Sequence, residues 1–170
     1  MREHIEQKTN AEKTALIAKV LYPYEKWELL ENGIYIAKSR MPRSAEQINV
    51  LEKELEQARI LVTHGSTVYL LPEADQPKIK KKKYPDAVVD GFIMEFKTVS
   101  GNERKIKEKY KEAREKADNV FLQIDAPFSQ KTVVSKLSGT IRGKGYETGL
   151  IWVYFSQNGK MTYWSVKDLK

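Results

Sequence analysis

Apolar and polar residues alternate most regularly between Tyr84 and Ser100, where two β-favouring runs flank a central Asp90-Gly91 pair. An Asp-Gly pair in this setting predicts a hairpin with a two-residue turn, because both turn positions need a positive φ. Successive side chains point to opposite faces of a strand. The pattern therefore predicts one face with Ile93, Glu95 and Lys97, and an opposite face with Phe92, Met94, Phe96 and Thr98.

A two-residue turn would also fix the pairing of the two strands. Val89 would face Phe92, and Asp86 would lie directly opposite Glu95, with Lys97 on their face. Like charges opposite each other destabilise a strand pair, so the two acids would need a cation, a shared proton or a metal ion nearby. The apolar residues of the other face are expected to supply the core contacts. We therefore predict a functional site at Asp86, Glu95 and Lys97, the alternative being a solvated ion pair on an exposed strand.

The first part of the chain predicts a helix, a hairpin and a second helix. Residues 1–22 carry a loose apolar stripe that ends at a proline, which cannot continue a helix. Residues 24–38 are typical of a small hairpin or extended arm around an Asn-Gly pair. Ser44-Ala45-Glu46-Gln47 is a capping box, and the apolar spacing after it predicts a helix that ends before His64-Gly65.

The remainder of the chain alternates between short strands and charged helices. We expect a strand at 67–73, a helix at 103–117, a strand at 120–124, a helix from Ser129 to Leu137, and a closing hairpin at 150–166. A polar linker, residues 74–83, precedes the central hairpin. Residues 138–145 hold three glycines and are predicted to form a turn.

Together these elements predict an α+β fold with a mainly antiparallel sheet, built from hairpins and covered by helices. An N-terminal helical arm, residues 1–43, would precede one α+β domain formed by residues 44–170. A chain of 170 residues is long enough to bury one substantial core.

Composition narrows the class of protein. With 41% hydrophobic and 31% charged residues the composition is that of an ordinary globular chain, and no apolar run approaches the roughly 20 residues that span a bilayer. The absence of cysteine and the presence of only two histidines argue against a thiolate nucleophile, a disulfide framework and a histidine-rich metal site. The acidic N-terminal segment lacks the form of a signal peptide. We expect a cytoplasmic protein with no membrane partner.

The charge distribution favours a polyanionic partner. The net charge is +7, and between Lys78 and Lys116 thirteen Lys and Arg residues stand against seven Asp and Glu residues. The glycine-rich segment 138–145 would let backbone amides approach a phosphate closely. The predicted nucleic-acid contacts, which are sequence-blind and salt-sensitive, are Lys80, Lys81, Lys82, Lys83, Arg104, Lys105 and Lys144.

Two known families share features with the central hairpin. Pro85-Asp86, followed by Glu95-Phe96-Lys97, resembles the signature of the PD-(D/E)xK nuclease superfamily, which is an acid near the start of one strand and an acid-x-lysine on the next. This resemblance implies a Mg²⁺-dependent DNA endonuclease in which the two acids hold the metal and the lysine helps to activate water. Carboxylate oxygens suit magnesium, which generates hydroxide and balances phosphate charge.

The other resemblance covers residues 45–170. The helix leading to residues 68–73, the segments 85–91 and 94–98, the basic helix and the closing hairpin resemble the CdiA C-terminal tRNase family. These are toxin domains of the barnase/RelE-like ribonuclease superfamily, found on contact-dependent toxins and on mobile elements. The resemblance implies metal-independent tRNA cleavage, in which the ribose 2′-OH attacks its own phosphate with help from a general base and stabilising cations. The residues that it implies as catalytic are Asp86, Glu95, Lys97, Thr98, Arg142 and Ser156.

We favour the longer resemblance because it extends well outside the short motif. It makes the chain a toxin-like endoribonuclease without a cofactor, with RNA and a cognate immunity protein as partners. Three alternatives stay open: a Mg²⁺-dependent DNA endonuclease with Asp86 and Glu95 as metal ligands, a nucleic-acid-binding module without catalysis, and a structural or attachment protein of a mobile element.

Overall fold

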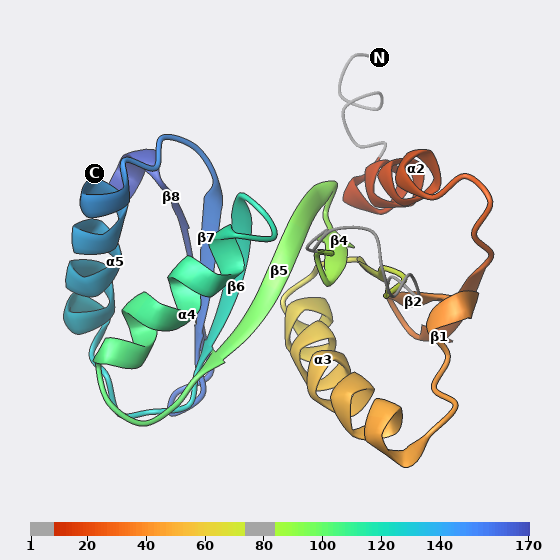
Figure 1. Cartoon of the computed structure of the whole chain (residues 1–170), viewed down its shortest axis with the longest axis horizontal. Helices are drawn as coiled ribbons and strands as arrows, with labels where there is room; N and C mark the ends of the chain where they lie inside the picture. Colours follow the sequence, from red (N-terminus) through yellow and green to blue (C-terminus); the bar gives the residue numbers. More distant parts are fainter. Residues whose placement is uncertain (1–8, 74–83) are drawn as a thin grey trace, which may run out of the picture. The chain divides into compact units, whose positions relative to one another are not determined.

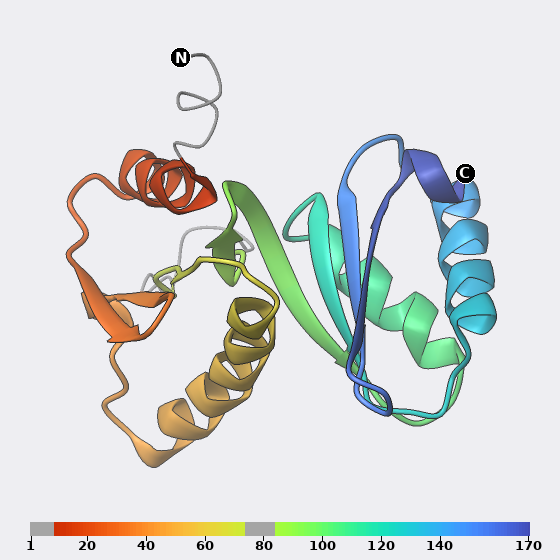
Figure 2. The ribbon, with the colours of Figure 1, turned by 180° about the vertical axis from the view of Figure 1, so that it is seen from behind.

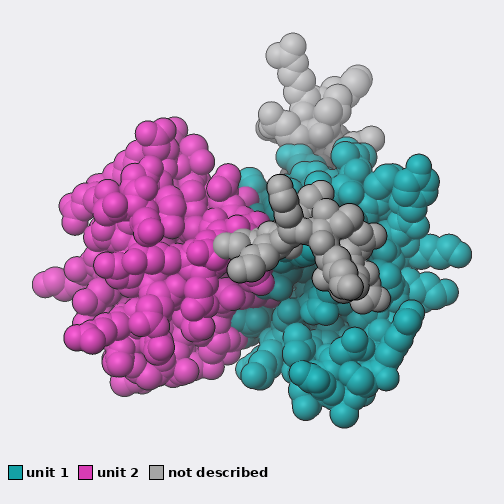
Figure 3. Space-filling view, in the orientation of Figure 1, with its two compact units in different colours: residues 1–93 teal, residues 94–170 magenta. Residues whose placement is uncertain are grey.

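The structure is a computed structural model that describes residues 9–73 and 84–170. The chain forms two compact units, residues 1–93 and 94–170, which are coloured separately in Figure 3. In its described residues each unit combines strands with two α-helices and one short 3-10 helix, and each unit is described by itself below. No helix in the described part of the chain is both long and apolar enough to cross a membrane.

The first unit contains four short strands in the order β1-β2-β3-β4 (Figure 1). Strands β1 and β2 are antiparallel, β2 and β3 are parallel, and β3 and β4 are antiparallel. Its elements are α2 (Asn10–Leu21), β1 (Trp27–Glu31), β2 (Ile34–Ala37), the short 3-10 helix η1 (Lys38–Arg40), α3 (Ala45–Thr63), β3 (Val68–Leu70) and β4 (Ala87–Val89).

Local sequence signals explain several of these boundaries. The Asn32-Gly33 turn joins β1 to β2, with Gly33 at φ 79°. The Ser44 hydroxyl accepts a hydrogen bond from the Gln47 amide at 3.2 Å, and the Gln47 side chain reaches back to the Arg43 amide at 2.7 Å. The Ser44 half of the predicted capping box is therefore present, while Gln47 accepts from the residue before the N-cap, and α3 ends at Thr63 as the sequence indicates.

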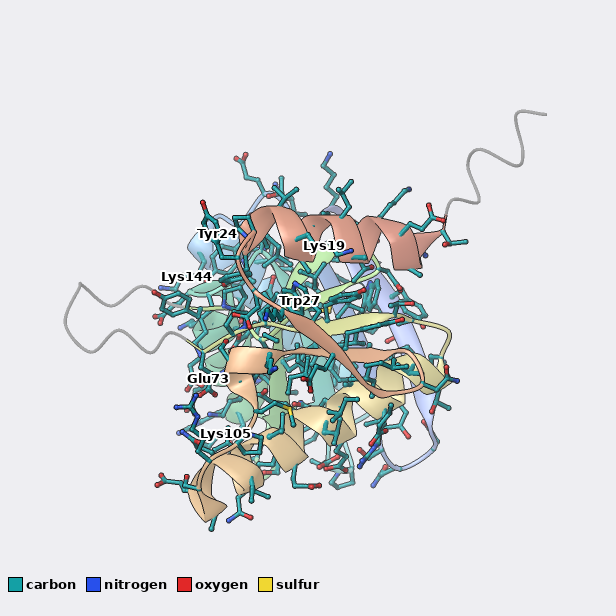
Figure 4. The ribbon with its side chains drawn as sticks, turned by 90° about the vertical axis from the view of Figure 1, so that its right-hand side faces the viewer. Lys19, Tyr24, Trp27, Glu73, Lys105 and Lys144 are labelled. Atoms are coloured by element: carbon teal, nitrogen blue, oxygen red, sulfur yellow. The ribbon has the colours of Figure 1, made fainter. Side chains whose placement is uncertain are left out.

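Helix α2 packs against β3 and β4 of the same unit. Ala18 of this helix is fully buried in an apolar cluster with Tyr69, Leu71 and Val88. The Thr14 hydroxyl also accepts a hydrogen bond from the Gly91 amide at 2.8 Å, so the helix holds the turn after β4. Tyr24, which follows the helix, is 98% exposed (Figure 4).

The second unit has four longer strands in the order β5-β6-β7-β8 (Figure 2). Strand β6 pairs in parallel with β5 on one side and with β7 on the other, and β7 and β8 are antiparallel. Its elements are β5 (Phe92–Val99), whose first two residues belong to the first unit, α4 (Arg104–Arg114), β6 (Asn119–Ile124), α5 (Gln130–Lys144), β7 (Leu150–Phe155), β8 (Lys160–Ser165) and the 3-10 helix η2 (Lys167–Leu169).

The predicted α+β class is confirmed, and the sheet is mixed, with parallel as well as antiparallel strand pairs. Helices α3, α4 and α5 each connect two strands that run in the same direction. A helical crossover returns the chain to the same edge and therefore gives parallel neighbours, whereas a short turn gives antiparallel ones. The prediction of a mainly antiparallel sheet took no account of these crossovers.

Helix α5 is longer than the sequence predicts. The predicted turn at 138–145 is wrong, because the helix continues to Lys144 and ends at Gly145, which has a left-handed φ of 68°. Leu137 and Ile141 are both fully buried one helical turn apart, so core packing holds the helix through its glycines. The backbone of this segment consequently serves the helix and does not form a phosphate-binding turn.

The core of the second unit lies between α4, α5 and one face of the strands. Ile106 and Tyr110 of α4 and Leu137 of α5 are fully buried in the same cluster as Val120 and Leu122 of β6. Burial raises the pKa of the Tyr110 hydroxyl to about 12. Figure 2 shows both helices on the same side of these strands.

Gly149 is the most tightly enclosed glycine of this unit. Its φ is +127°, and a Cβ atom would overlap the Asp118 carbonyl oxygen and the Arg114 guanidinium. That guanidinium donates to the carbonyl oxygens of both Asp118 and Thr148, so neither group can move away without losing hydrogen bonds.

We expect Gly149→Ala to destabilise the protein by about 2–3 kcal/mol, through overpacking and backbone strain. Urea unfolding followed by circular dichroism measures this difference. The matched control is Gly139→Ala, since this helical glycine has open space around its Cβ position and should gain stability by roughly 0.5–1 kcal/mol. Equal unfolding midpoints for Gly149→Ala and the unchanged protein would contradict the prediction.

Candidate functional site

Glu95 and Lys97 lie on the same face of β5, as the sequence predicts. In the parallel pairing with β6, Glu95 is level with Val120 and Lys97 with Leu122. Those two β6 residues point into the core under α4 and α5, so Glu95 and Lys97 face the helices as well. The expectation that only the opposite face supplies core contacts is therefore wrong. The cause is again the crossover, which places α4 over this face.

The Glu95 carboxylate is almost completely buried and is paired with two ammonium groups. Its side chain is 2% exposed, and its Oε1 atom lies 3.2 Å from the Lys116 Nζ and 3.6 Å from the Lys97 Nζ. A buried charge is tolerated only when it is paired or otherwise compensated. The two lysines come from different elements, β5 and the turn that follows α4, and meet at one oxygen atom.

The ion pairs continue from this carboxylate along α4. The Lys97 Nζ also lies 3.8 Å from a Glu112 carboxylate oxygen, and Lys109 donates to the same carboxylate at 3.0 Å. The result is an alternating series, here called the Glu95 charge row, made of Lys116, Glu95, Lys97, Glu112 and Lys109. Lys97 is 21% exposed and Lys116 is 36% exposed, so the cations are accessible while the central acid is not.

Asp86 belongs to the first unit and directly precedes β4. Its backbone carbonyl oxygen accepts from the Leu71 amide at 2.9 Å and from the Arg40 guanidinium at 3.3 Å. The turn after β4 has two residues, Asp90 and Gly91, with φ of 50° and 86°, which confirms the predicted turn. The pairing of Asp86 with Glu95 stays a prediction from that turn.

Arg40 is a buried arginine whose side chain contacts the backbone just before β4 and just after β3. Its guanidinium donates to the Leu71 carbonyl oxygen at 3.1 Å as well as to that of Asp86. It also forms an ion pair with Glu54 of α3, and a second one with Glu73 at 3.7 Å. With its side chain only 5% exposed, Arg40 fixes the backbone on both sides of the undescribed segment 74–83.

The other residues predicted to be catalytic lie apart from the Glu95 charge row. Thr98 is exposed on the opposite face of β5, level with Gln123 of β6. Ser156 follows β7, and its hydroxyl donates to the Asp125 carboxylate. Arg142 is exposed in the last turn of α5. The structure thus brings Glu95 and Lys97 together, and leaves these three side chains elsewhere in the second unit.

Three of the predicted nucleic-acid contacts lie among the described residues, all of them on the second unit. Lys80, Lys81, Lys82 and Lys83 fall outside the described residues. Arg104 is exposed at the start of α4, and Lys105 donates to Glu108 at 2.7 Å, a hydrogen bond that raises the pKa of Lys105. Lys144 is exposed at the end of α5; Figure 4 labels both Lys105 and Lys144.

Two parts of the site were missed from the sequence, namely Arg40 and the residues of α4 that pair with β5. The spacing of Lys109, Glu112 and Lys116 is three and then four, which places them along one side of a helix. From the sequence alone, such a charged stripe is typical of a solvated helix face. Recognising the β5-α4-β6 crossover would have placed it beside β5. Arg40 carries no local signal, because its partners are far away in sequence.

No protein-family model matches the sequence, and no curated protein does. Among solved structures, a chain of the CdiA-CT/CdiI toxin and immunity complex from Burkholderia pseudomallei is similar to this one, with a TM-score of 0.47 and 21% sequence identity. The likeness covers 73% of this chain and 92% of that chain.

Proposed function

We propose that the chain is a metal-dependent nuclease of the PD-(D/E)xK kind, with Asp86 and Glu95 as its acids and Lys97 as its lysine. The observation that carries the proposal is the burial of the Glu95 carboxylate beside two accessible ammonium groups, on the strand that follows Asp86 through a two-residue turn. An acid at the start of one strand and an acid-x-lysine on the next is the arrangement that this chemistry uses.

Burial separates this mechanism from general-base catalysis by Glu95. A general base must come within about 2.6–3.2 Å of the proton that it removes, or reach it through one water molecule. A carboxylate that is 2% exposed has no room for a ribose hydroxyl at that distance. A metal ion bound to one carboxylate oxygen would keep the nucleotide itself at a distance from Glu95, because water and substrate phosphate complete the rest of its shell. We therefore assign Glu95 to metal binding and not to direct deprotonation of a nucleotide.

Carboxylate oxygens are the donor type that magnesium prefers. Mg²⁺ is commonly held by one or two carboxylates, with water and substrate phosphate completing its shell. Glu95 supplies one carboxylate, and the predicted strand pairing would add that of Asp86. Among the described residues no group of three or more histidines and acids could hold a metal ion, and a two-carboxylate site needs no such group. A bound magnesium ion would lower the pKa of a coordinated water and neutralise phosphate charge.

The lysines supply the remaining chemistry. The Lys97 ammonium lies 3.6 Å from Glu95 and is partly exposed, so it can donate to an attacking water or to a phosphate oxygen beside the acid. Fixed cations aimed at developing negative charge stabilise a phosphoryl-transfer transition state. The net charge of +7 favours association with a nucleic acid of either kind.

A metal-independent ribonuclease is the second candidate. It is favoured by the presence of two ammonium groups at one carboxylate, because a 2′-OH mechanism uses an acid together with cations that stabilise the phosphorane. In that case Glu95 would have to become accessible when RNA binds.

A toxin role, opposed by a cognate immunity protein, is the biological setting that we propose for this nuclease. It is supported by the resemblance of residues 45–170 to CdiA C-terminal toxin domains. Production of the chain should then stop growth of a bacterial host, and Lys97→Ala should relieve the effect.

Incubation of the purified protein with total RNA and with plasmid DNA, each with Mg²⁺ or with EDTA, tests the mechanism. We expect cleavage with Mg²⁺, none with EDTA, and product ends without a 2′,3′-cyclic phosphate, because water and not the ribose is the nucleophile. RNA cleavage that persists in EDTA and leaves cyclic phosphate ends would instead establish the second candidate. Absence of cleavage under every condition would refute both.

A further inference from the structure

A pocket of about 360 Å³ lies at the carboxyl ends of two parallel strands in the second unit. Strands β6 and β7 end level with each other, at Ile124 and Phe155. The pocket, here called the β6–β7 pocket, is formed by parts of the segments 127–130 and 155–160. In sheets with helical crossovers, ligands bind beyond the carboxyl ends of the parallel strands. The volume also falls within the roughly 300–1,000 Å³ of small-molecule sites.

Two phenylalanines give the pocket an aromatic wall. Phe155 is 6% exposed and belongs to the core of the second unit. Phe128 is partly buried and packs against that core, so its ring is fixed and still borders the pocket. A fixed aromatic ring with an accessible surface is the kind of group on which a nucleobase stacks.

The polar side of the pocket carries an ammonium group and amides. The Lys160 Nζ donates to the Gln130 Oε1 at 3.1 Å, which joins the first residue of β8 to the first residue of α5. Gln157 supplies a second amide side chain. Amide side chains pair with the edges of bases, and an ammonium group pairs with a phosphate. An aromatic wall with these groups beside it fits a nucleotide.

The charge of the second unit favours the same ligand. Residues 94–170 hold fifteen Lys and Arg against nine Asp and Glu, whereas residues 1–93 hold fifteen against fourteen. The positive excess of the chain thus lies mainly in the unit that contains the pocket. The acid nearest in sequence, Asp125, accepts from the Gln123 amide at 3.1 Å and from the Ser156 hydroxyl, and it is not one of the described residues that line the pocket.

We propose that the β6–β7 pocket is a nucleotide subsite, in which an unstacked base of a single-stranded nucleic acid lies on Phe128 and its phosphate contacts Lys160. The proposal rests on the proposed nuclease function, since this nucleotide would belong to the substrate. Glu95 is level with Ile151 through β6, and Phe155 lies about 13 Å further along the strand direction. The pocket would therefore hold a nucleotide other than the one that is cut, and would select single-stranded substrates.

Fluorescence anisotropy in EDTA with a labelled single-stranded DNA octanucleotide tests binding without cleavage. Neither proposed mechanism cuts this probe, because one needs a metal ion and the other a ribose 2′-OH. We expect Phe128→Leu to weaken binding roughly 5- to 10-fold at every salt concentration, through lost stacking. Lys160→Met should reduce the slope of log affinity against log salt by about 0.7, the value for one phosphate contact of a single strand.

A duplex probe and two variants serve as controls. The matching DNA duplex offers no unstacked base, so Phe128→Leu should not change its binding. Phe128→Tyr keeps the aromatic ring and should bind the octanucleotide like the unchanged protein. Lys167→Met removes the same charge beyond the opposite end of β8 and should leave the salt slope unchanged. If circular dichroism shows that Phe128→Leu does not fold, Phe128→Met replaces it in every measurement.

The outcomes separate the subsite from the nuclease function. Equal octanucleotide binding by Phe128→Leu and the unchanged protein overturns the subsite, and so does an equal change of slope in Lys160→Met and Lys167→Met. Absence of octanucleotide binding by the unchanged protein overturns it as well, while cleavage with Mg²⁺ in the earlier experiment would leave the nuclease function intact. The expected binding losses without any cleavage would support the subsite and refute the nuclease.

Discussion

Lys97→Ala is expected to lower the cleavage rate by roughly 10²–10³-fold while leaving the fold intact. Loss of one preorganised charge contact to a transition state typically has a cost of that size. The structural effect should be small, because Lys97 is partly exposed and Glu95 keeps the Lys116 ammonium at 3.2 Å. Because the Glu95 carboxylate is buried, we expect a stability loss of about 1–3 kcal/mol, with the protein still folded. Single-turnover cleavage rates and urea unfolding of the same preparations measure the two effects.

The matched control for this prediction is Lys109→Ala. Lys109 is the member of the Glu95 charge row that pairs with Glu112 and not with Glu95. Its replacement by alanine therefore removes one positive charge from the same surface, as Lys97→Ala does. It should change the rate by less than about threefold, since it contacts neither Glu95 nor the proposed phosphate position. Comparable rate losses for Lys97→Ala and Lys109→Ala would mean that the row acts through its overall charge, and Lys97 would lose its assigned role.

Features governed by neighbouring residues were predictable from the sequence. The Asp90-Gly91 turn follows from the need for positive φ at both positions, and the start of α3 from the Ser44 capping box. Glu95 and Lys97 share a face because strand side chains alternate. In each case the interaction that determines the structure joins residues within about four positions of each other in the sequence.

Features that depend on packing between distant segments were not predictable in this way. Gly139 and Gly143 suggested a turn, but burial of Leu137 and Ile141 against the strands stabilises the helix by more than two glycines destabilise it. The sequence shows that Lys109, Glu112 and Lys116 share one side of α4. It does not show on which face of the strands α4 packs. Because α4 packs on the face that carries Glu95, Lys116 can reach the Glu95 carboxylate.

Arg40 shows the same limit most clearly, since its partners lie 31 and 46 residues away. Nothing around Lys38–Arg40 distinguishes this arginine from a surface residue. Its burial depends on α3 and on the segments that enter and leave the undescribed residues 74–83. A single side chain thus sets the backbone position of Asp86, one of the two proposed metal-holding acids.

Arg40→Ala is accordingly expected to lower the free energy of unfolding by about 3–5 kcal/mol, the usual cost of breaking a buried ion pair by removing one partner. The substitution leaves the Glu54 carboxylate, whose side chain is 14% exposed, without its arginine, and it removes a donor from the Leu71 and Asp86 carbonyl oxygens. Urea unfolding monitored by circular dichroism measures the loss. The exposed neighbour Arg43 provides the control, since Arg43→Ala should stay within about 0.5 kcal/mol.

A second comparison tests whether the buried charge itself is responsible. In the double variant Arg40→Met with Glu54→Met, both charges are replaced by apolar groups of similar length, which is often neutral for a buried pair. We expect it to recover more than half of the stability lost in Arg40→Ala, although the Leu71 carbonyl oxygen still loses the Arg40 donor. If the double variant is less stable than Arg40→Ala, the hydrogen bonds to the two carbonyl oxygens hold this region. The ion pair with Glu54 would then be secondary, and the position of Asp86 would depend on the backbone contacts of Arg40.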